Sequence, residues 1–274
     1  MAEIRRVIVD GTIGTVEVTN GNFTWPDGRS FGVDNVQHLP PVEPRSVVCV
    51  HLNYRSRQEE LKRSQPAAPT YFWKSVNSIS SHKAKVVRPA NCQFLNYEGE
   101  IVLVVGRTTR NITPDMAPDY IWGYTVGNDL GLHDFRETDD NSMLRVKGSD
   151  TLGPIGPALV TDWDFRNKRI RTYVDGKVVQ DGNTEDLIFD PHYLLADLSR
   201  TITFQRGDII FTGTPANSRP VAPGSTVAVE VEGLGRLENP VVSGEWSVPT
   251  EYGACPMDTD AIRKIALGSD FKQG

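Results

Sequence analysis

The chain has 274 residues, of which 38% are hydrophobic and 23% charged, and this is the composition of an ordinary globular protein with enough residues for a sizeable core. Its net charge of -6 and the shortness of its basic clusters argue against binding to nucleic acid or to an anionic membrane. The three cysteines form no CxxC pair, and the sequence has neither a signal-peptide pattern nor an apolar run of about 20 residues, so we expect a cytoplasmic protein without a disulfide framework or a thiolate zinc site.

The first 45 residues predict a small β domain. Runs of β-branched or alternating residues are separated there by Asp-Gly and Asn-Gly pairs, which favour short strands joined by turns. We expect strands at 7–9, 12–18 and 23–25, with turns at Asp10-Gly11, Asn20-Gly21 and Asp27-Gly28. Pro40, Pro41 and Pro44 then predict a linker. The sequence thus divides into a β domain at 1–45, a main domain at 46–245 and a C-terminal extension at 246–274.

Strands dominate after residue 46, and helices are few. We expect strands at 47–50, 93–105, 121–128, 158–160, 170–174, 177–179, 209–211, 227–231 and 237–242. The expected helices are one capped by Asn53 and reaching Arg63, one capped by Asp190 with apolar residues up to Ile202, and one over 258–267. Because strands and helices do not alternate strictly, the pattern predicts a β-rich α+β fold rather than a doubly wound sheet.

Two acidic residues, Glu98 and Glu100, lie at the start of the apolar run 101–105. Residues i and i+2 of a strand share one face, so both carboxylates point the same way with Gly99 behind them. Two such carboxylates repel each other unless a cation lies between them, and a hard ion such as Mg²⁺ or Mn²⁺ prefers oxygen ligands. The alternative is a solvated acidic edge without a metal.

A third carboxylate, Asp129, follows Asn128 at the end of the next predicted strand. Placed there, it completes a three-carboxylate site that leaves coordination positions for water and substrate. The alternative is an Asn-Asp turn that is bonded to its own backbone.

Two further segments carry polar groups suited to a bound acid. Lys147 lies in a run that predicts a strand entering a turn, and its ammonium group would stabilise enolate charge, although an exposed loop lysine is the alternative. The segment from Thr212 to Pro215 follows a strand and presents hydroxyl and backbone N–H groups, which suits a carboxylate ligand or forms a plain turn.

Taken in this order and spacing, the four segments resemble the fumarylacetoacetate hydrolase family over residues 46–244, and the segments 144–147, 186–189 and 229–237 resemble its isomerases of aromatic catabolism. The resemblance implies a mixed β-roll or β-sandwich fold, a homodimer, and Mg²⁺ or Mn²⁺ held by Glu98, Glu100 and Asp129. It also implies that Lys147 and Thr214 face the substrate. We assign substrate binding to Arg57, Asn128, Gly213 and Thr214.

The sequence departs from this family at two positions. Family members that hydrolyse carbon–carbon bonds carry a histidine and a glutamate that activate water, but here Arg57 occupies the histidine position and Glu60 the glutamate position. A protonated arginine is no general base, although it can pair with Glu60 or bind a second substrate carboxylate. His133 replaces an arginine that often contacts the substrate, and it is either a proton carrier or a structural residue paired with Asp134.

The sequence therefore predicts a metal-dependent isomerase, or decarboxylase, of a 2-hydroxydienoic or 2-keto dicarboxylic acid in aromatic-compound catabolism. In this mechanism Lys147 holds the developing enolate, while Glu60 or His133 moves the proton. The alternative enzyme is an acylpyruvate or fumarylacetoacetate type of carbon–carbon bond hydrolase. The alternative from another class is an inactive ligand-binding relative, against which the presence of all three carboxylates argues.

Overall fold

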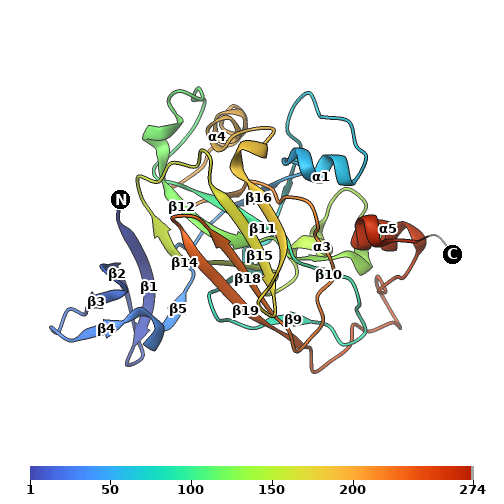
Figure 1. Cartoon of the computed structure of the whole chain (residues 1–274), viewed down its shortest axis with the longest axis horizontal. Helices are drawn as coiled ribbons and strands as arrows, with labels where there is room; N and C mark the ends of the chain where they lie inside the picture. Colours follow the sequence, from blue (N-terminus) through green and yellow to red (C-terminus); the bar gives the residue numbers. More distant parts are fainter. Residues whose placement is uncertain (273–274) are drawn as a thin grey trace.

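The computed structural model describes residues 1–272, and most of its ordered elements are strands. A ten-stranded sheet has the order β2-β1-β14-β12-β11-β17-β6-β7, with β5 beside β1 and β8 beside β14 (Figure 1). Its strands are β1 (Glu3–Val9), β2 (Thr12–Val18), β5 (Gln37–Leu39), β6 (Val47–Val50), β7 (Tyr71–Trp73), β8 (Ile79–Ser81), β11 (Gly99–Val105), β12 (Ile121–Asn128), β14 (Gly153–Val160) and β17 (Ile209–Phe211).

A second sheet of five strands has the order β16-β15-β18-β19-β9 and packs on the large sheet through contacts of β18 and β19 with β12 and β14. Its strands are β9 (Val86–Arg88), β15 (Arg169–Val174), β16 (Lys177–Asn183), β18 (Thr226–Val231) and β19 (Gly235–Ser243). Two short pairs complete the strands: β3 (Asn22–Thr24) with β4 (Ser30–Gly32), and β10 (Leu95–Asn96) with β13 (Gly131–Leu132).

Helices are short. The α-helices are α1 (Arg55–Glu60), α2 (Arg136–Asp139), α3 (Leu144–Gly148), α4 (Pro191–Ser199) and α5 (Asp260–Leu267). The 3₁₀ turns are η1 (Val33–Asn35), η2 (Val76–Ser78), η3 (Ala117–Tyr120), η4 (His133–Phe135), η5 (Thr184–Asp186) and η6 (Gly268–Asp270). Among residues 1–272, no helix is both long and apolar enough to cross a membrane. The predicted β-rich class with few helices is confirmed.

The core lies on both faces of β11, because successive residues of a strand point to opposite faces. Ile101 and Leu103 pack with Ile170 and Val229 of the second sheet, whereas Val102 and Val104 pack in a separate cluster on the other face. This alternation places the even-numbered face of β11, which includes Glu100, on the side away from the second sheet.

The N-terminal strands form a lobe that projects from the body of the molecule in Figure 1. They have a small core of their own, which includes Val7, Phe23 and Trp25. The lobe is joined to the large sheet, because Glu3 and Ile4 of β1 pair with Val160 and Leu159 of β14. The division of the chain into three domains remains a prediction.

Three local predictions are wrong. The single strand expected over 93–105 is broken into β10 and β11. Asn53 does not cap α1, because its side chain donates to the carbonyls of Phe189 and Thr212 and accepts from the Phe189 amide. Lys147 lies on the short helix α3 and not on a strand. In contrast, Asp190 caps α4 as predicted, with its side chain accepting from the Tyr193 amide.

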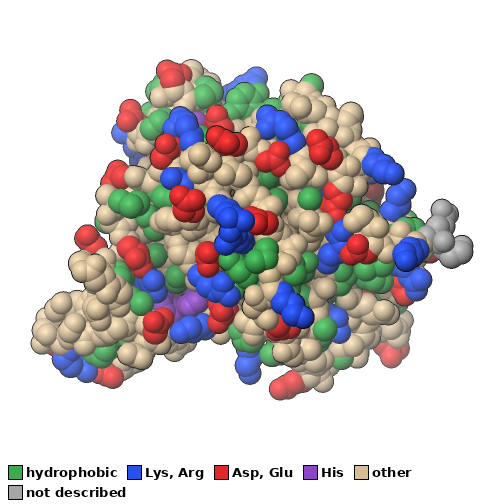
Figure 2. Space-filling view, in the orientation of Figure 1, with side chains coloured by type: hydrophobic (Ala, Val, Ile, Leu, Met, Phe, Trp, Pro, Cys, Tyr) green, Lys and Arg blue, Asp and Glu red, His purple; other side chains and the backbone are tan. Residues whose placement is uncertain are grey.

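Charged side chains on the face shown in Figure 2 are mixed in sign, with basic and acidic groups interspersed rather than gathered into one continuous basic band.

The substitution Gly99→Ala is expected to destabilise the contact between the two sheets. A Cβ at this position would lie 2.3 Å from Thr172 Oγ1 and 2.9 Å from Val229 Cγ1, which are atoms of the second sheet. Overpacking of this kind costs about 1–3 kcal/mol in free energy of unfolding, which urea denaturation would measure. The matched control is Gly32→Ala, whose Cβ would approach Asn35 Nδ2 at 3.3 Å and Asn22 Oδ1 at 3.7 Å, both at the ends of flexible side chains. Equal stability of the two variants would contradict the described packing.

Candidate metal and substrate site

Three carboxylates, which lie on or directly beside the adjacent strands β11 and β12, meet at one end of the large sheet. Gly99 pairs with Asn128 and Glu100 with Gly127, and the Asp129 amide donates to the Glu98 carbonyl at 2.9 Å. Because of this register, one carboxylate oxygen from each of Glu98, Glu100 and Asp129 lies within 4.8 Å of the others. The structure thus brings together the three residues that the sequence assigned to a metal.

Two buried lysines compensate part of this negative charge. Lys147 Nζ lies 2.6 Å from Glu98 Oε2 and 3.0 Å from Asp129 Oδ2, and it also donates to the Asp129 carbonyl at 2.6 Å. Lys74 Nζ lies 2.9 Å from Asp129 Oδ1. Two ammonium groups face three carboxylates, so the cluster retains net negative charge when all five groups are ionised.

The pKa values of the carboxylates differ with their surroundings. Burial raises the pKa of Glu100 well above its ordinary value, and the nearby charges of Asp129 and Glu98 raise it further. Burial also acts to raise the pKa of Asp129, but the ammonium groups of Lys147 and Lys74 outweigh it and lower that pKa. Burial lowers the pKa of Lys147, whereas Asp129 and Glu98 outweigh it and raise that pKa, so the lysine stays protonated.

This donor set suits a divalent cation. Glu100 is buried, and its Oε2 accepts one hydrogen bond from the Gly213 amide at 2.7 Å, which compensates only part of a full charge. Carboxylate oxygens are the ligands that hard cations such as Mg²⁺ and Mn²⁺ prefer, and a cation beside Glu100 would relieve its repulsion from Glu98 and Asp129. Glu98, Glu100 and Asp129 therefore fit a metal ion.

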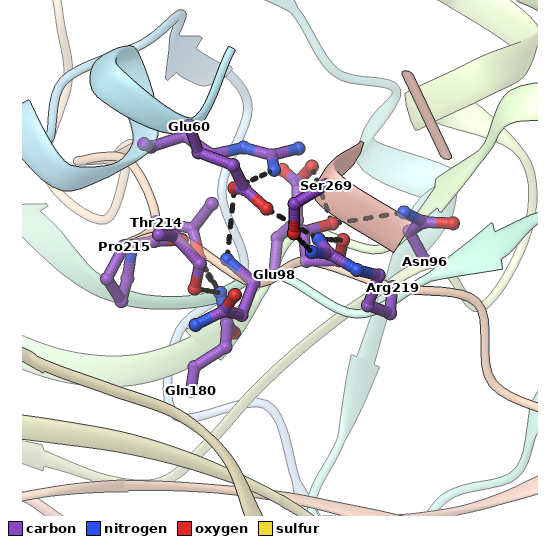
Figure 3. A network of polar contacts seen from close by, with 12 residues as sticks. Glu60, Asn96, Glu98, Gln180, Thr214, Pro215, Arg219 and Ser269 are labelled. Carbon is purple, nitrogen blue, oxygen red and sulfur yellow. Dashed lines mark hydrogen bonds and ion pairs between the residues drawn. The ribbon is translucent and has the colours of Figure 1, made fainter. Parts of the chain in front are cut away.

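The loop after β17 borders the triad. Gln180 Nε2 donates to Thr214 Oγ1 at 3.0 Å and to the Pro215 carbonyl at 2.8 Å, so a side chain of the second sheet holds this loop (Figure 3). Gly213 was predicted to bind substrate, but its backbone amide donates a hydrogen bond to Glu100 Oε2. Asn128, also predicted to bind substrate, accepts from the Glu98 amide through Oδ1 at 2.8 Å and so holds the segment before β11.

Arg57 and Glu60 form the i,i+3 ion pair that the sequence left open. Arg57 Nη1 lies 2.5 Å from Glu60 Oε2, and both side chains are largely buried. The second oxygen, Glu60 Oε1, lies 2.6 Å from Arg219 Nη1. Burial acts to raise the pKa of Glu60, but its two arginines outweigh this and lower it. Glu60 is therefore an engaged carboxylate held between two guanidinium groups.

His133 is buried beside Lys147. A Cβ on Gly131 would stand 3.2 Å from His133 Nε2 and 3.4 Å from Lys147 Nζ, so the glycine leaves space between the two nitrogens. Within residues 1–272, neither ring nitrogen of His133 has a hydrogen-bond partner, and the oxygens of Asp134 accept from the amides of Gln93 and Phe94 instead. Burial lowers the pKa of His133 well below its ordinary value, and the charge of Lys147 lowers it further. The imidazole is neutral at physiological pH.

Sequence reasoning missed Lys74, Gln180 and Arg219. A lone lysine directly after the apolar residues Tyr71, Phe72 and Trp73 was a weak signal for a buried cation. Gln180 and Arg219 carried no signal, because their roles depend on contacts with residues distant in the sequence: Gln180 with the loop at 214–216, and Arg219 with Glu60.

A family model described as the C-terminal domain of fumarylacetoacetate hydrolase matches residues 46–242. The 4-hydroxyphenylacetate degradation bifunctional isomerase/decarboxylase of Salmonella dublin is 38% identical over 229 residues, or 82% of this chain. The chain spans about half the length of that relative, since the match covers 50% of it.

Solved structures give the same relationship. The 5-carboxymethyl-2-hydroxymuconate delta-isomerase from Mycobacterium smegmatis superposes with a TM-score of 0.81 at 33% identity, covering 88% of this chain and 99% of that chain. The 2-hydroxyhepta-2,4-diene-1,7-dioate isomerase from Mycobacterium marinum also gives 0.81, at 32% identity, covering 89% of this chain and 100% of that chain.

Glu100→Gln is expected to stabilise the metal-free protein at neutral pH. Because the pKa of Glu100 is raised in the fold, its contribution to stability is present below the unfolded value of 4.5 and is lost as pH rises. In EDTA, the free energy of unfolding of the unmodified chain should fall between pH 5 and pH 8 by at most ~1.4 kcal/mol per pH unit. The variant should lack this decline, as urea denaturation at each pH would show. The surface variant Glu245→Gln is the control and should keep it. If the decline in stability persists in Glu100→Gln, it arises from other titratable groups.

Proposed function

This chain belongs to the fumarylacetoacetate hydrolase family of enzymes, and from that membership we propose that it is a metal-dependent isomerase of a 2-hydroxydienoic or 2-keto dicarboxylic acid in aromatic-compound catabolism. Decarboxylation of such an acid uses the same enolate chemistry and forms part of the proposal. The names of the relatives from Salmonella dublin and the two mycobacteria support this substrate class. We further propose a cytoplasmic homodimer.

The observation that carries the proposal is the position of Glu60 between Arg57 and Arg219. A hydrolase needs a group that removes a proton from water, and a protonated guanidinium cannot do so. Glu60 is a weak base, because its pKa is lowered and both of its oxygens accept hydrogen bonds. Because two arginines engage the glutamate at the water-activating position, this arrangement favours proton transfer on a bound acid over carbon–carbon bond hydrolysis.

We assign the metal to Glu98, Glu100 and Asp129. When bound there, Mg²⁺ or Mn²⁺ would supply Lewis-acid polarisation of the substrate's keto and carboxylate oxygens. Lys147 stays protonated and holds the enolate oxygen as negative charge develops on it. Glu98 and the Asp129 carbonyl fix its position, and we assign to the enolate oxygen the donor that faces Asp129 Oδ2.

We assign the proton transfer to His133, with Glu60 as the second candidate. Both groups are unprotonated near neutral pH, but the ring nitrogens of His133 have no partner among residues 1–272, whereas both oxygens of Glu60 are engaged. We assign Thr214, Gly213 and Asn128 to contacts with the bound acid. Among residues 1–272, Arg57 has one ion-pair partner, and we assign its remaining donors to the second carboxylate of the substrate.

Product analysis tests the reaction class. We expect the purified chain with Mg²⁺ to convert 2-hydroxyhepta-2,4-diene-1,7-dioate to a species of unchanged mass, with loss of the diene absorbance. EDTA should abolish the reaction, and Mg²⁺ or Mn²⁺ should restore it. Lys147→Met should lower kcat by about 100-fold or more, as expected for removal of one electrostatic stabiliser. Cleavage of acetylpyruvate to pyruvate and acetate by the unmodified chain would instead assign it to the hydrolases.

Arg57→His tests whether this arginine excludes hydrolysis. The variant places a titratable imidazole three residues from Glu60 and removes a permanent positive charge from it, so a water-activating pair becomes available. We expect measurable cleavage of acetylpyruvate, with a higher KM for dicarboxylic substrates. Arg57→Met is the matched control, because it also loses the ion pair but supplies no base. Equal hydrolysis by both variants would contradict the assigned role of Arg57.

A further inference from the structure

Residues 257–270, which we call the C-terminal strap, run beside the candidate site although they lie outside the matched region 46–242. The Met257 amide donates to the Asp134 carbonyl at 2.9 Å, and Thr259 Oγ1 donates to Glu137 Oε1 at 2.6 Å. These two partners lie within four residues after His133 in the chain. In Figure 1, α5 of the strap lies on the same side as α3 and β10, away from the N-terminal lobe.

The strap is anchored by its helix. Ile262 and Ala266 are fully buried and pack with Phe94, which precedes β10. Asn96 Nδ2 donates to the Ala266 carbonyl at 2.8 Å and to Ser218 Oγ at 3.2 Å. Because apolar burial and a buried hydrogen bond both fix α5 in place, the turn η6 that follows it has a defined position.

Arg219 joins this turn to α1. Its Nε donates to Asp270 Oδ2 at 2.8 Å, its Nη2 to Ser269 Oγ at 2.8 Å, and its Nη1 to Glu60 Oε1 at 2.6 Å. Glu60 then holds Arg57, so one line of charge-assisted hydrogen bonds runs from the strap to α1 (Figure 3). The planar guanidinium of Arg219 fixes the direction of each bond.

Gly268 is required at the start of the turn. Its φ is +54°, and a Cβ there would lie 2.7 Å from Arg219 Nη1 and 2.8 Å from Glu60 Oε1. Both atoms are the ends of flexible side chains, so an added methyl group would separate the ion pair more readily than it would displace the backbone. The turn and the Arg219–Glu60 pair therefore fit together only with glycine at this position.

We propose that the C-terminal strap positions the Arg57–Glu60 pair beside the carboxylate triad, with Arg219, Ser269 and Asp270 as positioning residues. The pair between Arg219 and Asp270 alone contributes little, because the Asp270 side chain is 68% exposed. The Arg219–Glu60 contact is largely buried and is the step that transmits the position of the strap to α1. The inference rests on the proposed function only for the identity of the substrate.

The test compares Gly268→Ala with Gly253→Ala by hydrogen exchange of the peptide that contains α1, measured in the full chain. Gly253 is the matched control, since it has a φ of +74° and an added methyl group there would meet no neighbouring atom within 4 Å. We expect faster exchange in α1 for Gly268→Ala and for Arg219→Met, and no change for Gly253→Ala. Unchanged exchange in Gly268→Ala and Arg219→Met would overturn the proposal, whatever the activity of the chain.

Kinetics separate positioning from general destabilisation. With the dicarboxylic substrate, Gly268→Ala is expected to raise KM by about tenfold with kcat nearly retained. A tenfold weakening of substrate binding is what the loss of one charge-assisted hydrogen bond would give. Arg219→Lys keeps the positive charge but lacks the planar guanidinium with its several N–H donors. It should give a smaller rise in KM than Arg219→Met. A fall in kcat without a change in KM would overturn the positioning role. Absence of turnover in the unmodified chain would refute the proposed function and leave hydrogen exchange as the test of the strap.

Discussion

The candidate site depends on three carboxylates that are held close together at the end of a buried sheet. The antiparallel register of β11 and β12 sets their positions, and the contact of Gly99 with the second sheet fixes the start of β11, between Glu98 and Glu100. Such an arrangement is unfavourable by itself, because like charges repel and burial disfavours ionisation. Lys147 and Lys74 provide only part of the compensation. The remaining negative charge is the property that makes the cluster suited to a cation.

Elements far apart in the sequence complete the surroundings of this cluster. Gln180 comes from the second sheet and holds the loop at 214–216, while α1 supplies Arg57 and Glu60. Arg219 contacts both α1 and the C-terminal strap. The sheet end therefore carries the carboxylates, and short helices and loops carry the groups that we assign to the distal part of a substrate.

The metal-ligand candidates were predictable because they obey a local rule. Alternation along a strand put Glu98 and Glu100 on one face, and the end of the neighbouring strand delivered Asp129. The fold class followed from the dominance of strands. The lost cap at Asn53 was not predictable, since a tertiary contact decided it: Asn53 bonds to the backbone of residues 189 and 212, which lie far away in the sequence. The sequence around Lys147 also gave no signal for the short helix α3. Lys74, Gln180 and Arg219 escaped prediction because only the folded chain brings them to the site.

The positions of the two chain ends have a practical consequence for handling this protein. Figure 1 places the N-terminus at the lobe of β1–β5 and the C-terminal helix beside the α1 and α3 side of the molecule. An affinity tag or fusion partner added before residue 1 would stand away from the carboxylate triad. One added at the other end would follow Ser269 and Asp270, which contact Arg219, by only a few residues. Recombinant forms of the protein should therefore carry their tags at the N-terminus.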